Sequence, residues 1–457
     1  MTTITKTDFP LKIFRDFINE HPDIKFTLPG DAEWTDVTKC YIKTSGSPSI
    51  VVRPQITAHI QDLVRFCASQ NVDFVVRSGG HDCMGRSQVN GALTIDMRGI
   101  QHVHVSEDKI TARIGGGILT RELTKVLDIH GLITPTAPVA SVGYVGWATL
   151  GGYGPLSTKY GLGVDQIVGA KYVNAEGSLI DAGEDELKAI RGAAGCLGVI
   201  TEMTIKVYPL KEILEGSFVF ESRNKHTAWI AFAEGYTKLI STEDIPPSLS
   251  LQPTGVAVPG MGNIFSLSCA WADEDHEEGR KWMKKIAALG TCIMEVVKPT
   301  TWSAHCEEKE KHSGYGVYGR AYTLNFKEFT PKTVDVLARY NASIPGPGSL
   351  FSMQFHRDPA RPLDSVFSPR EDHYWLEIIA TARDEAAAEV ADQWALALKR
   401  ELLDQDPDNV LDSAYLGFLD DGETDLKKVF GDHYESLRAT KERVDTKNVF
   451  RNSIPRL

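Results

Sequence analysis

The stretch Val75-Val76-Arg77-Ser78-Gly79-Gly80-His81-Asp82 tells most about this chain. An apolar, strand-like run stops at a pair of glycines and places one imidazole at the turn. Glycine lets the backbone approach a ligand without interference from a Cβ atom, and a histidine nitrogen there can act as ligand, base or nucleophile. A glycine turn with an incidental polar residue gives the same pattern, so the rest of the chain has to separate the two interpretations.

Two further glycine clusters follow along the chain. One is Gly115-Gly116-Gly117, after a strand-like run, and the other extends from Gly143 to Gly154. Loops of this kind expose several backbone N–H groups together, and such groups hold phosphate without help from a side chain. Each cluster alone is explained by a tight turn, but together they indicate a long, phosphate-bearing ligand.

Five blocks in order along the chain resemble the flavoproteins of the vanillyl-alcohol oxidase and p-cresol methylhydroxylase type, and within them the berberine bridge enzyme-like group. The blocks are residues 51–70, 77–81, 151–165, 191–202 and 434–450. In the first block a strand precedes a helix in which Ile60, Leu63, Val64 and Cys67 recur at helical spacing and share one face. The resemblance covers nearly the whole chain.

The resemblance implies FAD as the cofactor, with His81 joined to the 8α-methyl group of its ring. Many members of the group carry a second link through a cysteine, but that position falls on Val139, which supplies no thiolate. Cys83 is expected to be a small buried residue rather than a substitute. The residues expected to contact the flavin are Arg77, Ser78, Gly79, Gly80, His81, Asp82, Gly85, Gly117, Pro138, Ser141, Val142, Gly143, Gly146, Gly151, Gly152, Tyr153, Gly154, Val199 and Ile200.

The expected fold is α+β, with two domains of the PCMH-type FAD-binding architecture. A chain of 457 residues exceeds what one compact core usually holds. The resemblance assigns residues 1–208 to the first part of the FAD-binding domain and 209–410 to a substrate domain, an antiparallel sheet backed by helices. Residues 411–457 then return to the FAD-binding domain. A helix is predicted at 386–403, with Val390, Trp394, Ala397 and Leu398 on one face.

Candidate catalytic residues lie on two predicted strands. In residues 349–356, period two places Ser352, Gln354 and His356 on one face and Phe351, Met353 and Phe355 on the other. The apolar set is expected to pack under the helices, which leaves Gln354 and His356 to line the substrate cavity. A polar sheet face in water explains the same alternation, and both interpretations stay open.

Glu377 and Tyr415 are the two candidate bases. Glu377 interrupts a run of large apolar side chains, and a desolvated carboxylate has a raised pKa suited to a general base. The family's own acidic or amide position falls near Ala380, however, on the opposite face of the strand. The family's Tyr-x-Asn-Tyr segment aligns with residues 415–418, where Gly417 and Phe418 replace the amide and the second phenol. Tyr415 is either a base or a core aromatic residue.

These features predict an FAD-linked oxidoreductase. We expect an oxidase that moves a hydride from an alcohol or amine carbon of a small, secondary-metabolite-like substrate to the flavin, with O2 as acceptor. Val142 falls where oxidases of the group tend to carry a small residue. Three alternatives are a flavin-containing cyclase or isomerase without net redox change, a carbohydrate oxidase, and a flavin-binding protein that is not an enzyme. The changed residues at 417 and 418 weigh against carbohydrate.

Composition narrows the partners. The net charge of −12 argues against nucleic acid and anionic membranes, and no stretch reaches the roughly 18 apolar residues of a membrane helix. Without a recognisable signal peptide, and with seven scattered cysteines and no CxxC pair, the chain is expected to be cytoplasmic. The oligomeric state is left open.

Two other motifs are set aside. Residues 314–319 match GxGxxG, but a charged segment precedes them and a strand-like run follows, so a turn in the substrate domain is predicted. His305, Cys306 and His312 lie in a segment that is read as a solvated Glu/Lys helix face, and no metal site is predicted.

Overall fold

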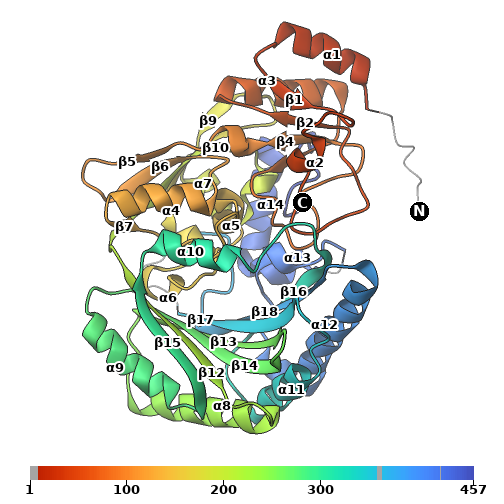
Figure 1. Ribbon diagram of the computed structural model, residues 1–457. Helices are drawn as coiled ribbons and strands as arrows, with labels where there is room; N and C mark the ends of the chain where they lie inside the picture. Colours follow the sequence, from red (N-terminus) through yellow and green to blue (C-terminus); the bar gives the residue numbers. More distant parts are fainter. Residues whose placement is uncertain (1–8, 358–362, 423) are drawn as a thin grey trace.

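The computed structural model describes residues 9–357, 363–422 and 424–457. Two small sheets with their helices form the upper part of Figure 1, and a large sheet forms the lower part. Among the helices in these ranges, none combines the length and apolar character needed to span a membrane.

The first small sheet carries the strand that leads to His81. Its strand order is β1 (Lys25–Thr27), β2 (Ile50–Arg53), β4 (Leu93–Asp96) and β3 (Phe74–Arg77), and the last three are parallel. Helix α3 (Thr57–Gln70) connects β2 to β3. Helix α1 (Leu11–Glu20) precedes β1, and α2 (Trp34–Val37) lies between β1 and β2 in the sequence. The predicted helix face is confirmed, because Ile60, Leu63, Val64 and Cys67 are all buried in this core.

The second small sheet is antiparallel. Its order is β5 (Val103–Val105), β6 (Thr111–Gly115), β10 (Val199–Lys206), β8 (Ile167–Val173) and β9 (Leu179–Asp181). Its helices are α4 (Thr120–Ile129), α5 (Tyr144–Thr149), α6 (Ser157–Tyr160) and α7 (Glu184–Ala193), and a two-stranded ribbon joins β7 (Leu132–Ile133) to β11 (Tyr208–Pro209). The glycine-rich loops expected to bind flavin connect these elements.

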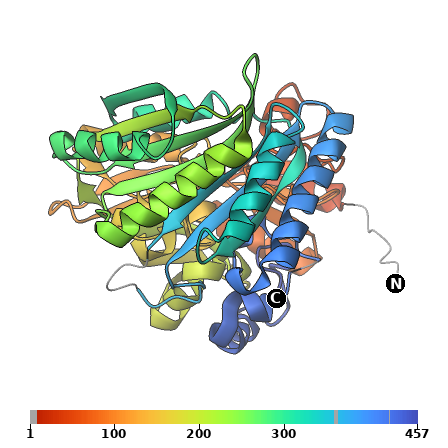
Figure 2. The ribbon, with the colours of Figure 1, turned by 90° about the horizontal axis from the view of Figure 1, so that it is seen from below.

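The large sheet has seven antiparallel strands. Their order is β15 (Cys292–Thr300), β12 (Ile213–Phe220), β14 (Gly262–Trp271), β13 (Leu249–Val258), β17 (Ser349–His356), β18 (His373–Ala382) and β16 (Tyr318–Phe326). Figure 2 shows the helices lying side by side across one face: α8 (Lys225–Thr242), α9 (His276–Ala287), α11 (Pro331–Ala342) and α12 (Glu385–Gln405). The other face is turned toward the two small sheets, with α10 (Trp302–Glu310) between them in Figure 1.

The alternation predicted for β17 is confirmed on its apolar side, because Phe351, Met353 and Phe355 pack in the core under the helices. The face predicted for α12 is partly wrong. Trp394 and Leu398 are buried, whereas Val390 and Ala397 are exposed. Small residues, among them Ala391 and Ala395, contact the sheet instead.

The last segment packs against the first part of the chain. Helices α13 (Leu426–Phe430) and α14 (Tyr434–Val444) precede a loop in which Asp445 accepts from the backbone N–H of Val449 and Phe450. The Phe450 ring packs edge-on against Phe74 of β3, with 5.8 Å between the ring centroids. The end of the chain thereby contacts the strand that leads to His81.

Candidate functional site

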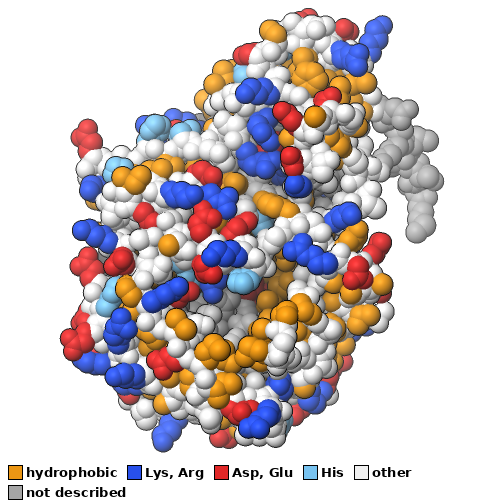
Figure 3. All heavy atoms as spheres, in the orientation of Figure 1, with side chains coloured by type: hydrophobic (Ala, Val, Ile, Leu, Met, Phe, Trp, Pro, Cys, Tyr) orange, Lys and Arg blue, Asp and Glu red, His pale blue; other side chains and the backbone are white. Residues whose placement is uncertain are grey.

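A cavity of about 1030 Å³ lies between the open face of the seven-stranded sheet and the glycine-rich loops. Figure 3 shows the molecule hollowed between its upper and lower parts, with apolar side chains along the lower rim. A volume of this size is at the upper end of the range that small-molecule and cofactor sites occupy.

The His81 turn forms part of the cavity wall. Strand β3 ends at Arg77, and Gly80 follows with φ of +70°, a conformation that favours glycine. A Cβ atom on Gly79 would lie 2.2 Å from the Ser141 carbonyl oxygen and 2.6 Å from the Gly143 nitrogen. The glycine at 79 is therefore what lets the 141–143 loop pack directly on the turn.

The turn offers donors suited to an anionic cofactor. Within the described ranges, the backbone N–H groups of Gly79, Gly80 and His81 donate to no protein acceptor. Across the cavity wall, a Cβ atom on Gly146 would meet nothing within 4 Å. Unpaired amides beside open space are what a phosphate-bearing ligand requires, so the residues present fit FAD.

The imidazole of His81 has three close neighbours. Its Nε2 lies 2.7 Å from Ser141 Oγ, and its ring stacks on Tyr41 at 5.4 Å and contacts Tyr315 at 5.0 Å between ring centroids. Desolvation by the surrounding protein lowers the pKa of His81 to about 4. The ring is therefore neutral near pH 7, as a nucleophile has to be.

A buried ion pair holds the residue that precedes this turn. Asp96 is fully buried and contacts the guanidinium groups of Arg53, Arg77 and Arg98 at 2.8, 3.2 and 2.7 Å. Burial alone would raise its pKa, but hydrogen bonds and charge from Arg98, Arg77 and Arg53 hold the pKa of Asp96 well below its ordinary value. Arg77 also donates to the carbonyl oxygen of Val37.

The opposite wall carries a carboxylate. Glu377 on β18 faces the cavity and accepts hydrogen bonds from Ser352 Oγ on β17 and from Gln252 Nε2 on β13, the second at 3.3 Å. Burial raises the pKa of Glu377 despite both hydrogen bonds. Ala380, where the family position falls, is buried on the helix-covered side, so Glu377 is the acidic residue on the cavity side of this strand.

An aromatic group lies beside that carboxylate. Trp375, Tyr153 and Tyr415 all line the cavity, and the first two rings stack at 4.7 Å between centroids. The Tyr415 hydroxyl has a long contact of 3.5 Å to the carbonyl oxygen of Trp147, and burial raises the pKa of this phenol strongly. Tyr415 is therefore a buried aromatic residue, as one of the two interpretations predicted, and its ring also lines the cavity.

The expectation that His356 lines the cavity is wrong. Its ring packs against Tyr153 and His373, at 5.9 and 4.8 Å between centroids, and it is absent from the cavity wall, whereas Gln354 is part of that wall. The Tyr153 hydroxyl donates to His373 Nε2 at 2.7 Å, and Tyr153 lines the cavity whereas His373 does not. Alternation along the strand predicted the correct face for His356 but not where the cavity stops.

Most of the expected flavin-contacting residues line the cavity. These are Arg77, Ser78, Gly79, Gly80, His81, Asp82, Pro138, Val142, Gly143, Gly146, Tyr153, Val199 and Ile200. Ser141 lies directly behind His81. Gly85, Gly117, Gly151 and Gly152 are not part of the wall, and Gly154 borders a smaller pocket.

Glycines behind the wall have packing reasons of their own. A Cβ atom on Gly117 would lie 1.7 Å from the Met97 carbonyl oxygen, and one on Gly151 would lie 2.5 Å from the Phe367 ring. Gly85 and Gly152 have φ of +76° and +82°. These glycines shape the loops whose neighbours face the cavity.

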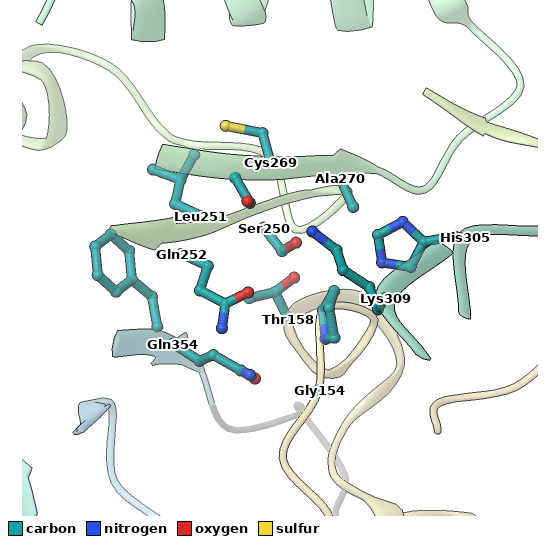
Figure 4. A pocket seen from close by; sticks show the side chains of 13 residues that line it. Gly154, Thr158, Ser250, Leu251, Gln252, Cys269, Ala270, His305, Lys309 and Gln354 are labelled. Atoms are coloured by element: carbon teal, nitrogen blue, oxygen red, sulfur yellow. The ribbon is translucent and has the colours of Figure 1, made fainter. Parts of the chain in front are cut away.

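The smaller pocket adjoins the main cavity, and several polar side chains lie among its largely apolar lining. Figure 4 shows Ser250, Gln252, Thr158 and Gln354 directed toward a common space, with Lys309 reaching in from α10. His305 and Cys306 on the same helix are buried, not solvated as expected from the sequence, and His305 Nδ1 lies 3.3 Å from Glu215.

The turn predicted for the GxGxxG stretch is confirmed for residues 314–317, which connect α10 to β16, whereas Tyr318 and Gly319 already belong to β16. The Gly316 N–H donates to the carbonyl oxygens of Cys40 and Tyr41, and Val317 forms a bridge to Ile42. This loop brings Tyr315 to His81. Sequence reasoning missed Tyr41, Tyr315 and Glu310 because they lie far from residue 81 along the chain, the two tyrosines in loops and Glu310 at the end of α10.

Comparisons with known proteins agree with this geometry. Residues 48–183 match the family described as FAD binding domain, and residues 414–455 match the one described as Berberine and berberine like. The FAD-linked oxidoreductase aurO of Gibberella zeae is 32% identical over 440 residues, which cover 94% of this chain and 85% of that protein.

Solved structures have the same fold. BBE-like 1 of Physcomitrella patens has a TM-score of 0.82 at 18% identity, covering 95% of this chain and 97% of that one. The 6-hydroxy-D-nicotine oxidase of Arthrobacter nicotinovorans has a TM-score of 0.83 at 19% identity, covering 95% and 98%. These likenesses confirm the expected two-domain, α+β FAD-binding fold.

Proposed function

Because the chain belongs to the berberine bridge enzyme-like family of FAD-linked oxidoreductases, we propose that it oxidises a small, secondary-metabolite-like alcohol or amine. The cofactor is FAD joined covalently through His81 alone. Val139 supports the single link, because an apolar side chain lines the cavity where a second link would need a thiolate.

One observation carries the proposal: the His81 turn and Glu377 border the same cavity from opposite sides. A substrate between them has a hydride acceptor on one side and a carboxylate on the other.

Glu377 is the proposed general base. Its raised pKa makes the carboxylate a stronger base toward the proton of a substrate hydroxyl or ammonium group than an exposed glutamate would be. Ser352 and Gln252 hold the carboxylate in place through their hydrogen bonds. When bound, FAD supplies the acceptor for the hydride that leaves the substrate carbon.

The cavity wall favours an aromatic or otherwise flat, apolar substrate. The rings of Tyr153, Trp375 and Tyr415 give it a broad apolar surface, and such rings pack well against another ring. Val142 lines the cavity beside the His81 turn and offers O2 an apolar approach. We therefore propose O2 as the electron acceptor and hydrogen peroxide as its product.

Anaerobic mixing tests this function. Amines, secondary alcohols and phenolic alkaloids are added to the holoenzyme without O2, and a substrate bleaches the visible absorbance of the flavin in proportion to the enzyme present. Readmitted O2 then restores the absorbance and releases peroxide. Product formation without bleaching or O2 consumption would contradict the proposal and identify a non-redox cyclase or isomerase.

A further inference from the structure

We infer that Ser141 and Glu310 are positioning residues that prepare His81 for its own attachment to the cofactor, an inference that rests on the covalent link proposed above. His81 Nε2 lies 2.7 Å from Ser141 Oγ, and Ser141 Oγ donates to Glu310 Oε2 at 2.7 Å. The Ser141 backbone N–H donates to the same carboxylate oxygen at 2.9 Å. The three residues form one chain of hydrogen bonds.

The chemistry of these groups determines which atom donates in each of these hydrogen bonds. An ionised carboxylate only accepts, so the Ser141 hydroxyl hydrogen points to Glu310. Ser141 Oγ then accepts from His81, which places the imidazole hydrogen on Nε2 and the lone pair on Nδ1. Within the described part of the chain, no residue takes Nδ1, so this nitrogen is the nucleophile.

The ring has little freedom to turn away. Tyr41 and Tyr315 contact it, and the Tyr315 hydroxyl donates to the Gly79 carbonyl oxygen at 2.6 Å. A reacting atom held in one orientation gains rate because the entropy of alignment is lost before the reaction. The hydrogen-bond chain adds the correct tautomer to that fixed orientation.

The attachment step balances with O2 as the oxidant. A bond forms between His81 Nδ1 and the 8α carbon, while one C–H bond of the methyl group and the Nε2–H bond of His81 are broken. Ser141 and Glu310 accept the Nε2 proton as Nδ1 becomes alkylated. Two electrons and two protons leave in total, and they reduce one O2 to hydrogen peroxide.

The chain of hydrogen bonds crosses between the two halves of the molecule. Glu310 ends α10, which follows the seven-stranded sheet's β15, whereas Ser141 lies in the loop before α5. Glu307 on the same helix makes a separate contact, with Arg121 at 2.7 Å and Lys125 at 3.0 Å on α4. A Glu307→Gln variant therefore weakens the same interface without touching His81, and serves as the matched control.

The experiment follows attachment over time. Full-length protein is produced under riboflavin limitation and mixed with FAD in air, and the flavin that stays with acid-precipitated protein is measured. We expect Ser141→Ala and Glu310→Gln to attach FAD at least about 100-fold more slowly than the wild type, the low end of what a positioned proton acceptor contributes. Glu307→Gln should match the wild type, and Glu310→Asp should recover part of the rate.

Two readouts separate positioning from simple loss of structure. The acid-released FAD shows whether each variant still binds the cofactor, and the double variant shows whether the residues act in series. In series, Ser141→Ala with Glu310→Gln is no slower than Ser141→Ala alone. Attachment at the wild-type rate in Glu310→Gln, or slowing in the double variant equal to the product of the two single effects, would overturn the inference.

Failure of the underlying cofactor proposal looks different. In that case, wild-type protein carries no acid-stable flavin, or His81→Ala carries as much as the wild type. If the wild type is labelled at His81 and Glu310→Gln is labelled equally fast, only the role of Ser141 and Glu310 is excluded.

Discussion

Replacing Asp96 by asparagine tests what holds the His81 turn in place. Asp96 is fully buried and contacts three guanidinium groups, but these differ in their access to water. The Arg53 and Arg98 side chains are 36% and 23% exposed and can turn to solvent, whereas Arg77 is 1% exposed. The cost of the substitution therefore comes mainly from Arg77, left buried without a counter-charge.

The magnitude follows from that burial. Removing one partner of a buried ion pair costs about 3–5 kcal/mol. Asparagine keeps one acceptor oxygen, and Arg77 keeps its bond to the Val37 carbonyl oxygen, so the lower end, about 3 kcal/mol, is expected. This corresponds to a roughly 150-fold larger unfolded fraction. Arg53→Gln removes a partly exposed partner of the same carboxylate and should cost no more than about 1 kcal/mol.

Urea unfolding of the holoenzyme at pH 7, followed by circular dichroism, measures both variants. The pKa of Asp96 is lowered in the folded state, so its contribution is present above the ordinary value of 3.8 and is lost as the pH falls below it. The difference in free energy of unfolding between the wild type and Asp96→Asn should therefore decrease in acid. Equal stabilities for Asp96→Asn and Arg53→Gln at pH 7 would refute the reasoning.

Three further predictions concern the site. Glu377→Gln should slow the anaerobic bleaching of the flavin by a substrate about 10²–10⁴-fold, with its flavin content unchanged. The bleaching rate of the wild type should fall as the pH drops through the raised pKa of Glu377. If the variant bleaches at the wild-type rate, Glu377 is not the base. Gly79→Ala should lose most of its acid-stable flavin, because the new Cβ atom would lie 2.2 Å from the Ser141 carbonyl oxygen. The control Gly169→Ala, whose Cβ atom would have no neighbour nearer than 3.4 Å, should keep its flavin. Equal flavin contents in the two variants would contradict this packing argument. Tyr415→Phe should change the rate of bleaching by no more than about threefold, because the Tyr415 phenol is too weak an acid to serve as an ionised base. A loss of rate beyond about 100-fold would instead make Tyr415 the general base.

The sequence predicted those parts of the site that have a local pattern. The turn at His81 follows a strand and two glycines, and the alternation in residues 349–356 placed Phe351 in the core and Gln354 in the cavity. His356 has the same parity as Gln354 but lies past the cavity, because period two fixes a face and not a depth. The α12 face was partly wrong because alanines, not Val390, allow the helix to approach the sheet.

The neighbours of His81 could not be predicted in the same way. Tyr41 lies in the loop between α2 and β2, and Tyr315 lies in the loop between α10 and β16. Glu310 is the last residue of α10. Their positions depend on how the two halves of the molecule pack. Neither helical nor strand periodicity contains that information.

Peptide mapping of the denatured holoenzyme by mass spectrometry tests the central claim most directly. The account predicts that flavin stays with the peptide that contains His81, that no cysteine peptide carries it, and that His81→Ala releases all flavin in acid. Complete release of flavin from the wild type, or a flavin-bearing peptide without His81, would contradict it.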